Sequence, residues 1–559
     1  MKEITKLWPW FAAVCSGVLY ALCFAPFNLT WFCWIALTPL IGAIWFSGTG
    51  SHHSWLRSLL LGYVAGLTFF WIVFSWLTTV TVLGWFVLQF YMAIYFAIWA
   101  WFCDLVRPRA PDKKRLRAAS KWDQMLVQAR TAAPPSVQSP WTKSTSNLRL
   151  AFVLAAVWTT LEWLRGWVFS GFGWNGLGVA LHDNWPLIQI TELTGVAGLS
   201  FLVAFANVIV ITTAYRLVVE ARTRVMRPHF DFTVTMAGIV GVLIFGIRAA
   251  QVAPTTKPLR VAAVQSNVPQ NQKFDPDFTR RIFDQFHRLS EIALRSNPPP
   301  DLLVWPESSM PGPVLSDQQS REFVMDLAAS SETDLLLGTI DVDERNAYNA
   351  AILISDGGER VQVYRKVHLV PFGEYVPGRH NVPLLAQIVG DQVPADFKAG
   401  TEYTVFTLTN SSVHVAPLIC FEDTIGELTR QFVLPTETSA GANVLVDMTN
   451  DAWFRRSAGS HQHLANAIFR TVETRRPMIR AANTGVTCFI NQFGRITQIL
   501  QDDTGSTFTE GVLAGEIKVP VEPEFTFYVR HGELFAKACT AITLLSLLLV
   551  VGFRRWKRA

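Results

Sequence analysis

Three short segments of the chain carry residue types that together can perform acyl transfer. Cys420 follows an apolar run in A-P-L-I-C-F-E-D, Glu307 ends the strand-like run L-L-V-W-P-E, and Lys366 lies in Y-R-K-V-H-L-V-P-F-G-E-Y-V-P. A thiol attacks a carbonyl at neutral pH when a base takes its proton or when its pKa is lowered. We expect Glu307 to be that base, and Lys366 to stabilise the thiolate and the oxyanion of a tetrahedral intermediate.

Each of these residues has a simpler explanation when it is considered alone. A single Cys on a strand is usually a small buried apolar residue, and Glu and Lys are usually solvated at the surface. The combination of all three, in this order and with these flanking residues, is much more specific. Glu374 lies eight residues after Lys366, and we expect it to orient Lys366 or Glu307 through a hydrogen bond.

The region that must position these residues, 258–518, has the pattern of a layered α/β domain. Short β-branched runs alternate with amphipathic stretches, and residues 277–296 and 459–476 have helical periodicity. Asp356-Gly357-Gly358 indicates a hairpin turn. The apolar segment 382–390 is either a core strand or a mobile lid that touches lipid.

The chain as a whole is too apolar for an ordinary soluble enzyme. Of its 559 residues, 50% are hydrophobic and 16% are charged, and it contains 21 Trp and 39 Phe. Runs of about 17–25 apolar residues match the length that a bilayer requires. We expect eight membrane spans, near residues 8–26, 30–47, 57–80, 83–106, 150–170, 195–217, 232–250 and 534–553.

The distribution of basic residues orients these spans. With the N-terminus in the cytoplasm, the inside loops 107–149 and 218–231 and the tail after 553 carry clusters of Lys and Arg. We expect loop 107–149 to be an orientation signal and spacer near anionic headgroups rather than a binding segment. The expected domains are a seven-helix membrane domain (1–250), an extracytoplasmic catalytic domain (251–533), and a last span with a basic tail (534–559).

Two other groups of polar residues have competing explanations. Glu162 and Arg165 lie three apart in a span and can pair on one helix face, either to hold helices together or to contribute to a substrate cavity. His461 and His463 could suggest a metal site, but their helix-like setting without a carboxylate or thiolate partner argues against one. No zinc-type cysteine spacing, nucleotide-binding motif or nucleic-acid motif is found. We expect no metal, no cofactor and no nucleic-acid partner.

The order W-P-E, Y-R-K-x-H-L-V-P-F-G-E-Y-V-P, C-F-E resembles the carbon–nitrogen hydrolase (nitrilase) superfamily, which has a Glu–Lys–Cys triad on an α-β-β-α sandwich. The fuller resemblance is to the apolipoprotein N-acyltransferases, the membrane branch of that superfamily. The chain differs from these enzymes in its long loop 107–149 and in Phe421, where some members carry Tyr. The shared motifs are Q-S-N-V-P-Q at 265–270, P-F-G-E-Y-V-P at 371–377, N-D-A-W-F at 450–454, R-R-P-M-I-R-A-A-N-T-G at 475–485 and L-E-W-L-R-G at 161–166.

This resemblance implies an acyl donor and an acceptor. The donor is a phospholipid, which we expect to be phosphatidylethanolamine, and the acceptor is the α-amino group of the S-diacylglyceryl cysteine of an apolipoprotein. It further implies a monomer in the inner membrane with its catalytic domain on the periplasmic side. The resemblance also assigns supporting roles to Glu374 and Glu422 beside the triad and to Trp453 and Phe274 at the lipid entrance.

Two other classes of function compete with this one. A membrane-tethered amidase or nitrilase shares the triad, but it needs one anchor rather than eight spans. A transporter with a regulatory soluble domain normally carries more ionisable groups in its spans than Glu162 and Arg165. The sequence therefore favours an integral membrane acyltransferase with a thioester intermediate on Cys420.

Overall fold

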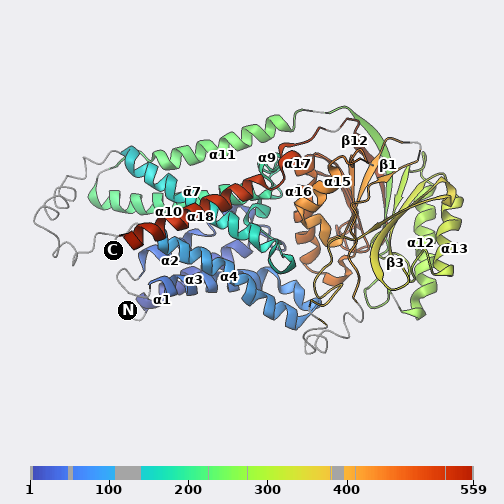
Figure 1. Cartoon of the computed structure of the whole chain (residues 1–559), viewed down its shortest axis with the longest axis horizontal. Helices are drawn as coiled ribbons and strands as arrows, with labels where there is room; N and C mark the ends of the chain where they lie inside the picture. The colour runs from blue at the N-terminus through green and yellow to red at the C-terminus, as the bar shows by residue number, and fades with distance from the viewer. Residues whose placement is uncertain are drawn as a thin grey trace, which may run out of the picture.

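A computed structural model shows a helical bundle at one end of the molecule and a two-sheet α/β domain at the other (Figure 1). Phe274, the segment 382–390 and most of loop 107–149 lie outside the residues that it describes, so the expectations for them stay predictions. The described residues are 4–47, 54–107, 140–224, 226–252, 254–273, 275–377, 379, 396–409, 411–437, 439–522 and 524–556.

Helices form wherever the eight spans were expected. In the described part of the chain, four helices are long and apolar enough to cross a membrane, namely α3, α4, α10 and α11, and two shorter apolar helical segments lie at 30–46 and 534–550. The chain is therefore a membrane protein. The main helices of the bundle are α1 (Ile4–Ala21), α2 (Thr38–Phe46), α3 (Ser54–Val73), α4 (Val82–Val106), α7 (Pro140–Arg165), α10 (Val196–Thr223), α11 (Phe230–Ala249) and α18 (Leu534–Trp556).

The α/β domain contains two six-stranded sheets, which confirms the expected layered α/β fold. In spatial order, the first sheet is β12 (Gly511–Pro520), β1 (Thr256–Gln265), β2 (Leu302–Val304), β3 (Asp334–Val342), β4 (Ala347–Ser355) and β5 (Arg360–Arg365). The second sheet is β11 (Ile496–Ile499), β10 (Cys488–Ile490), β9 (Met478–Ala482), β8 (Val444–Thr449), β7 (His414–Ile419) and β6 (Phe406–Thr407).

Helices cover both outer faces of this pair of sheets. Helices α12 (Thr279–Leu294) and α13 (Gln318–Ala329) cover the first sheet, and α15 (Gly426–Val433) and α16 (Gly459–Thr474) lie between the second sheet and the bundle (Figure 1). Both predicted helical stretches are thus confirmed. The turn Asp356–Gly358 joins the antiparallel strands β4 and β5, as its sequence indicates.

Parallel pairing brings chain segments that are far apart in sequence to one edge of the sheets. Strands β1, β2 and β3 pair in parallel at the centre of the first sheet, and β7, β8 and β9 do so in the second. The carboxyl ends of parallel strands meet at the same edge. Glu307 follows β2 and Cys420 follows β7, so the fold brings the predicted nucleophile and base toward each other.

Gln462 joins the α/β domain to the membrane bundle. Its side chain is buried, and its amide nitrogen donates to the carbonyl oxygens of Ala25 at 2.8 Å and Val73 at 3.0 Å. Its amide oxygen accepts from the Trp76 indole at 2.9 Å and from the Asn175 amide at 2.8 Å. One side chain on α16 therefore satisfies four polar groups of the bundle at once.

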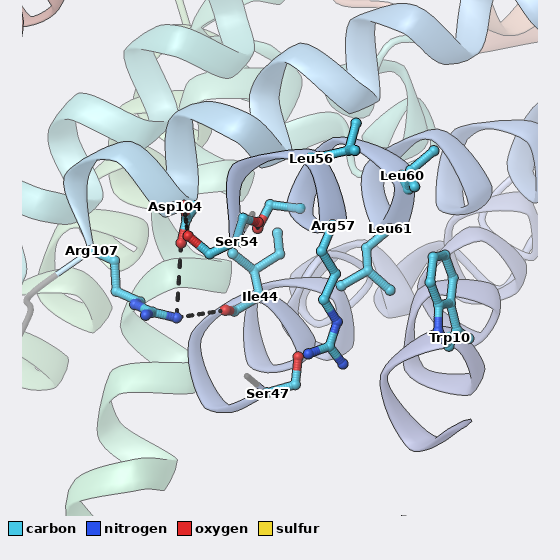
Figure 2. A pocket seen from close by; sticks show the side chains of 11 residues that line it. Trp10, Ile44, Ser47, Ser54, Leu56, Arg57, Leu60, Leu61, Asp104 and Arg107 are labelled. Atoms are coloured by element: carbon cyan, nitrogen blue, oxygen red, sulfur yellow. Dashed lines mark hydrogen bonds and ion pairs between the residues drawn. The ribbon is translucent and has the colours of Figure 1, made fainter. Parts of the chain in front are cut away.

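A cavity of about 290 Å³ lies at the opposite end of the bundle, where α3 begins and α4 ends (Figure 2). Arg107 donates to the carbonyl oxygen of Ile44 at 3.1 Å and lies 3.8 Å from Asp104. Arg57 also lines this cavity. Basic side chains thus gather at the end of the bundle farthest from the α/β domain, the end from which the basic loop 107–149 leaves α4.

We predict that Gln462→Leu weakens the docking of the α/β domain on the bundle. It leaves buried donors on Trp76 and Asn175 and buried acceptors on Ala25 and Val73 without partners, at a cost of about 1–3 kcal/mol each. The apparent melting temperature in detergent should fall and protease cleavage between the two domains should rise. His461→Gln is the matched control on the same helix, because His461 is exposed. Equal melting temperatures for both variants would contradict this role.

Candidate active site

Glu307 is held at the carboxyl end of β2 with one carboxylate oxygen bonded. Oε1 accepts from the Asn349 amide at 2.7 Å, whereas the buried Oε2 has no hydrogen-bond partner among the described residues. Gly338 on the neighbouring strand makes this position possible, because a Cβ there would lie 2.6 Å from the Glu307 Cα. The unpaired Oε2 gives the site an acceptor that is available for a proton.

Lys366 lies fully buried after β5 and is paired with Glu374. Its ammonium lies 3.0 Å from Oε1 and 2.9 Å from Oε2 of Glu374. Burial alone lowers the pKa of Lys366, but Glu374, and then Glu307 and Cys420, outweigh burial and raise the pKa above its usual value. The raised pKa favours the charged form of Lys366, and Glu374 is the carboxylate that pairs with it.

Asn349 on β4 links these two parts of the site and was not predicted. Its amide nitrogen donates to Glu307 at 2.7 Å and to Glu374 at 2.6 Å. The signal for it was present in the sequence, since Asn349 is a polar residue inside the apolar run A-Y-N-A-A-I-L. A buried amide in such a run needs polar partners.

Cys420 stands at a sharp turn where β7 ends and a short 3-10 helix begins. Its φ is 53°, in the left-handed region that non-glycine residues rarely adopt, and its side chain is half-buried. Burial, and then Glu307, raise the pKa of the Cys420 thiol well above its usual value, while Lys366 and Thr449 oppose the rise. A raised pKa favours the neutral thiol, and Glu307 is the carboxylate with the largest effect on it.

Glu422 connects the segment of Lys366 to the turn of Cys420. Its fully buried carboxylate accepts from the backbone N–H groups of Val367 at 2.9 Å, His368 at 3.1 Å and Ile419 at 3.0 Å, and from the Tyr364 hydroxyl at 2.8 Å. Burial raises the pKa of Glu422 to about 7, although Lys366 and the backbone donors lower it. The supporting position expected of Glu422 therefore has a geometric basis.

A buried ionic cluster lies beside the nucleophile turn. Arg480 contacts Asp423 at 3.0 Å and Asp451 at 3.2 Å, and it also pairs with Asp447, which faces it on the neighbouring strand. His463 lies 2.9 Å from Asp423 and 3.0 Å from Asp451. Although burial and Arg480 oppose it, the aspartates raise the pKa of His463 to about 10.

This cluster was not predicted, and it changes the interpretation of the two histidines. His463 belongs to a network of charges around Arg480, whereas His461 on the same helix is exposed. In the part of the chain that the structure describes, no group of three or more His, Cys, Asp or Glu residues could hold a metal ion.

Aromatic rings connect the nucleophile turn to the membrane bundle. Phe421 stacks on Phe172 and on Trp174, with ring centroids 6.0 Å apart in both pairs. The backbone oxygen of Trp453 accepts from the Thr79 hydroxyl at 3.1 Å, and the side chain of Trp453 is 39% exposed. The expected lipid-entrance residue Trp453 therefore lies at the junction between the α/β domain and the bundle.

Glu162 and Arg165 do not form the expected pair. The Glu162 carboxylate accepts from the Leu177 backbone at 2.7 Å and from Tyr20, and Arg165 donates to the carbonyl oxygen of Trp174 at 3.0 Å. The backbone of the loop after α7 offers each side chain a buried partner that would otherwise be unsatisfied. Both residues thereby support the loop whose Trp174 packs on Phe421.

We predict that Glu422→Gln disrupts the site although the side chain keeps its size. One carboxylate oxygen of Glu422 accepts from the Ile419 N–H, and the other accepts from the remaining donors. In glutamine one of these oxygens becomes an NH2 group, so a donor then faces a donor and at least one hydrogen bond is lost. Both the melting temperature and the rate of acylation of Cys420 should fall, the rate by at least about tenfold, since bonds to a charged group contribute about 1.5–3 kcal/mol each.

Glu359→Gln is the matched control for this prediction, because Glu359 is exposed in the β4–β5 turn. A Glu422→Gln protein with the control's melting temperature and acylation rate would show that Glu422 does not position the site.

Two family models match most of the chain. Residues 16–209 match the apolipoprotein N-acyltransferase N-terminal domain, and residues 260–521 match the carbon-nitrogen hydrolase family. A solved CN-hydrolase superfamily protein from Xanthomonas campestris is 17% identical, with a TM-score of 0.34, and the match covers 47% of this chain and 91% of that chain. A likeness at this level carries no functional argument.

Two relatives named apolipoprotein N-acyltransferase match over nearly the whole length. The apolipoprotein N-acyltransferase of Geobacter metallireducens is 33% identical over 95% of this chain and 92% of its own length. That of Bradyrhizobium diazoefficiens is 29% identical over 97% of this chain and 95% of its own length. By these matches and by its two-domain architecture, the chain belongs to the apolipoprotein N-acyltransferase family.

Proposed function

We propose that this protein transfers a fatty acyl chain from a phospholipid to the amino group of the S-diacylglyceryl cysteine of an apolipoprotein, through a thioester on Cys420. What supports this proposal most is a chain of bonds: Asn349 and Glu374 link Glu307 to Lys366, and Glu422 links the Lys366 segment to the turn of Cys420. That turn packs on the membrane bundle through Phe421. Family membership supplies the identity of the two substrates.

In the first half-reaction, the Cys420 sulfur attacks the carbonyl carbon of a phospholipid ester and its proton passes to the free oxygen of Glu307. Lys366 stabilises the negative charge on the carbonyl oxygen, with backbone N–H groups of the turn. The C–O bond to glycerol then breaks, and the leaving alkoxide takes the proton from Glu307. A lysophospholipid departs and a thioester remains on Cys420.

In the second half-reaction, the amine of the diacylglyceryl cysteine attacks the thioester carbonyl. Glu307 accepts the proton that the nitrogen loses, the C–S bond breaks, and Glu307 returns a proton to the sulfur. The products are an N-acylated lipoprotein and the free thiol of Cys420. In each half-reaction Glu307 therefore accepts one proton and gives it back. This requires a carboxylate that is fixed by one oxygen and has the other oxygen free, as is the case for Glu307 among the described residues.

The same proposal includes eight spans, with residues 251–533 on the periplasmic side of the inner membrane between the seventh and eighth. Residues 1–250 form the membrane domain, and 534–559 form the last span and tail. The cavity lined by Arg57 and Arg107 supports this orientation, because these cations lie at the end of the bundle where the basic loop begins. Phosphatidylethanolamine as donor and a monomeric state are parts of the proposal.

Trp453 and Phe274 are assigned to the lipid entrance. The half-exposed ring of Trp453 at the junction between the domains supports this role, since Trp prefers the boundary between headgroups and acyl chains. A hydrolase that acts on a small amide has no use for a nucleophile turn packed on a membrane bundle, which favours the acyltransferase over that alternative.

The decisive test supplies purified protein with a phospholipid that carries a labelled acyl chain and with a diacylglyceryl-cysteine peptide. We expect the label to appear in amide linkage on the peptide, and the Cys420→Ala protein to transfer none. Label that appears only as free fatty acid, in equal amount with and without the peptide, would identify a hydrolase instead.

We predict that Glu307→Gln and Lys366→Met lose transfer by at least about a thousandfold, because each removes a group that acts on every transition state. Both variants should still insert into the membrane and bind the peptide. Lys518→Met and Glu359→Gln, at exposed positions of the same domain, serve as controls. Transfer at the control rate by either triad variant would remove that residue from the mechanism.

A further inference from the structure

Lys273 is a second buried lysine in the active site. Its ammonium donates to the backbone carbonyl oxygen of Glu307 at 2.7 Å, and its side chain is 4% exposed. Glu307 and Cys420 are the two ionisable groups that interact with it. Lysines are almost never buried to this degree without a partner, so the position of Lys273 calls for a function.

A dedicated set of bonds holds the segment that ends at Lys273. Asn483, after β9, accepts from the Ser266 hydroxyl at 2.7 Å and from the Val268 backbone at 3.2 Å, and it donates to the Val268 carbonyl at 2.8 Å. Asn450, after β8, donates to the Gln270 side chain at 2.7 Å. Asn450 and Asn483, from the motifs at 450–454 and 475–485, thereby fix the Q-S-N-V-P-Q segment that precedes Lys273.

The charges of the site show what Lys273 adds. Lys366 is balanced by Glu374, which lies within 3.0 Å of its ammonium. Glu307 lacks a directly bonded cation in the described part of the chain, since Oε1 is bonded to a neutral amide and Oε2 has no partner. Lys273 supplies a cation close to Glu307, because its ammonium is bonded to the backbone carbonyl oxygen of that residue.

We propose that Lys273 is a positioning cation of the acyl transfer, which fixes the backbone of Glu307 and stabilises the negative charge that passes between Glu307 and Cys420. The inference rests on the proposed function for the reaction that it assists. It also concerns the reactivity of the Cys420 thiol, which can be measured by alkylation without any lipid substrate.

The charge of Lys273 also sets a pH dependence. Burial lowers the pKa of Lys273 to about 8, although Glu307 and Cys420 oppose this shift. Lys273 therefore loses its charge just above neutral pH, and the stabilisation of the thiolate is present below that pH and lost as the pH rises through about 8. Lys366 keeps its charge in this range because its pKa is raised. The pKa of Glu422, about 7, lies below that of Lys273.

Site-specific alkylation of Cys420 tests this inference, measured by peptide mass spectrometry in wild type, Lys273→Arg and Lys273→Met. At neutral pH we expect Lys273→Met to slow alkylation about tenfold, which corresponds to a rise of one unit in the pKa of the thiol. Lys273→Arg should keep the neutral rate, and above about pH 8 its rate should rise more steeply with pH than that of wild type, because guanidinium stays charged. Lys518→Met, at an exposed position, is the control.

The same proteins are then tested for thioester formation with labelled phospholipid, and their melting temperatures are compared. Altered alkylation together with no thioester in wild type would overturn the proposed function and leave only the effect of Lys273 on the Cys420 thiol standing. Alkylation of Cys420 in Lys273→Met with the rate and pH profile of wild type would overturn the role of Lys273. A lower melting temperature in Lys273→Met alone would not substitute for the expected change in the pH profile.

Discussion

One buried carboxylate, Glu422, links the two halves of the active site. Its acceptor bonds reach the segment after β5 in the first sheet and the turn after β7 in the second. Burying a carboxylate costs several kcal/mol, and four donors at about 1.5–3 kcal/mol each offset that cost. The segment of Lys366 and the strand end before Cys420 are held together because this one carboxylate accepts from both. Asn349 performs the same task between Glu307 and Glu374.

The second constraint is the attachment of this site to a membrane. Phe421, directly after the nucleophile, packs on Trp174 of the bundle, and His463 of the ionic cluster stacks on the same indole with ring centroids 5.1 Å apart. Gln462 lies next to His463 and fills four polar contacts of the bundle. The turn of Cys420 and the attachment to the bundle therefore share the same contacts, which is the arrangement that the proposed transfer from a membrane lipid requires.

Much of this arrangement could be predicted from the sequence, because apolar periodicity reports strands and helices directly and the triad residues stand at strand ends. The prediction that Glu162 and Arg165 pair with each other was wrong. Helix spacing places them on one face, but it cannot show that the backbone of the following loop bonds both side chains instead. Asn349, Arg480 and Asp447 were missed, although each is a polar residue inside an apolar strand and so signals a buried partner. Which partner it finds depends on strand register across the sheet, and register is a property of the folded chain.

The central claim is that Cys420 itself carries the acyl chain, and the intact mass of the protein tests it most directly. After incubation with one phospholipid of defined chain length and no acceptor, the protein should gain the mass of that acyl chain. The added mass should map to the peptide that contains Cys420, and hydroxylamine should remove it, as expected of a thioester. An unchanged mass in protein that nevertheless acylates the peptide, or an acyl group on any other residue, would contradict the account.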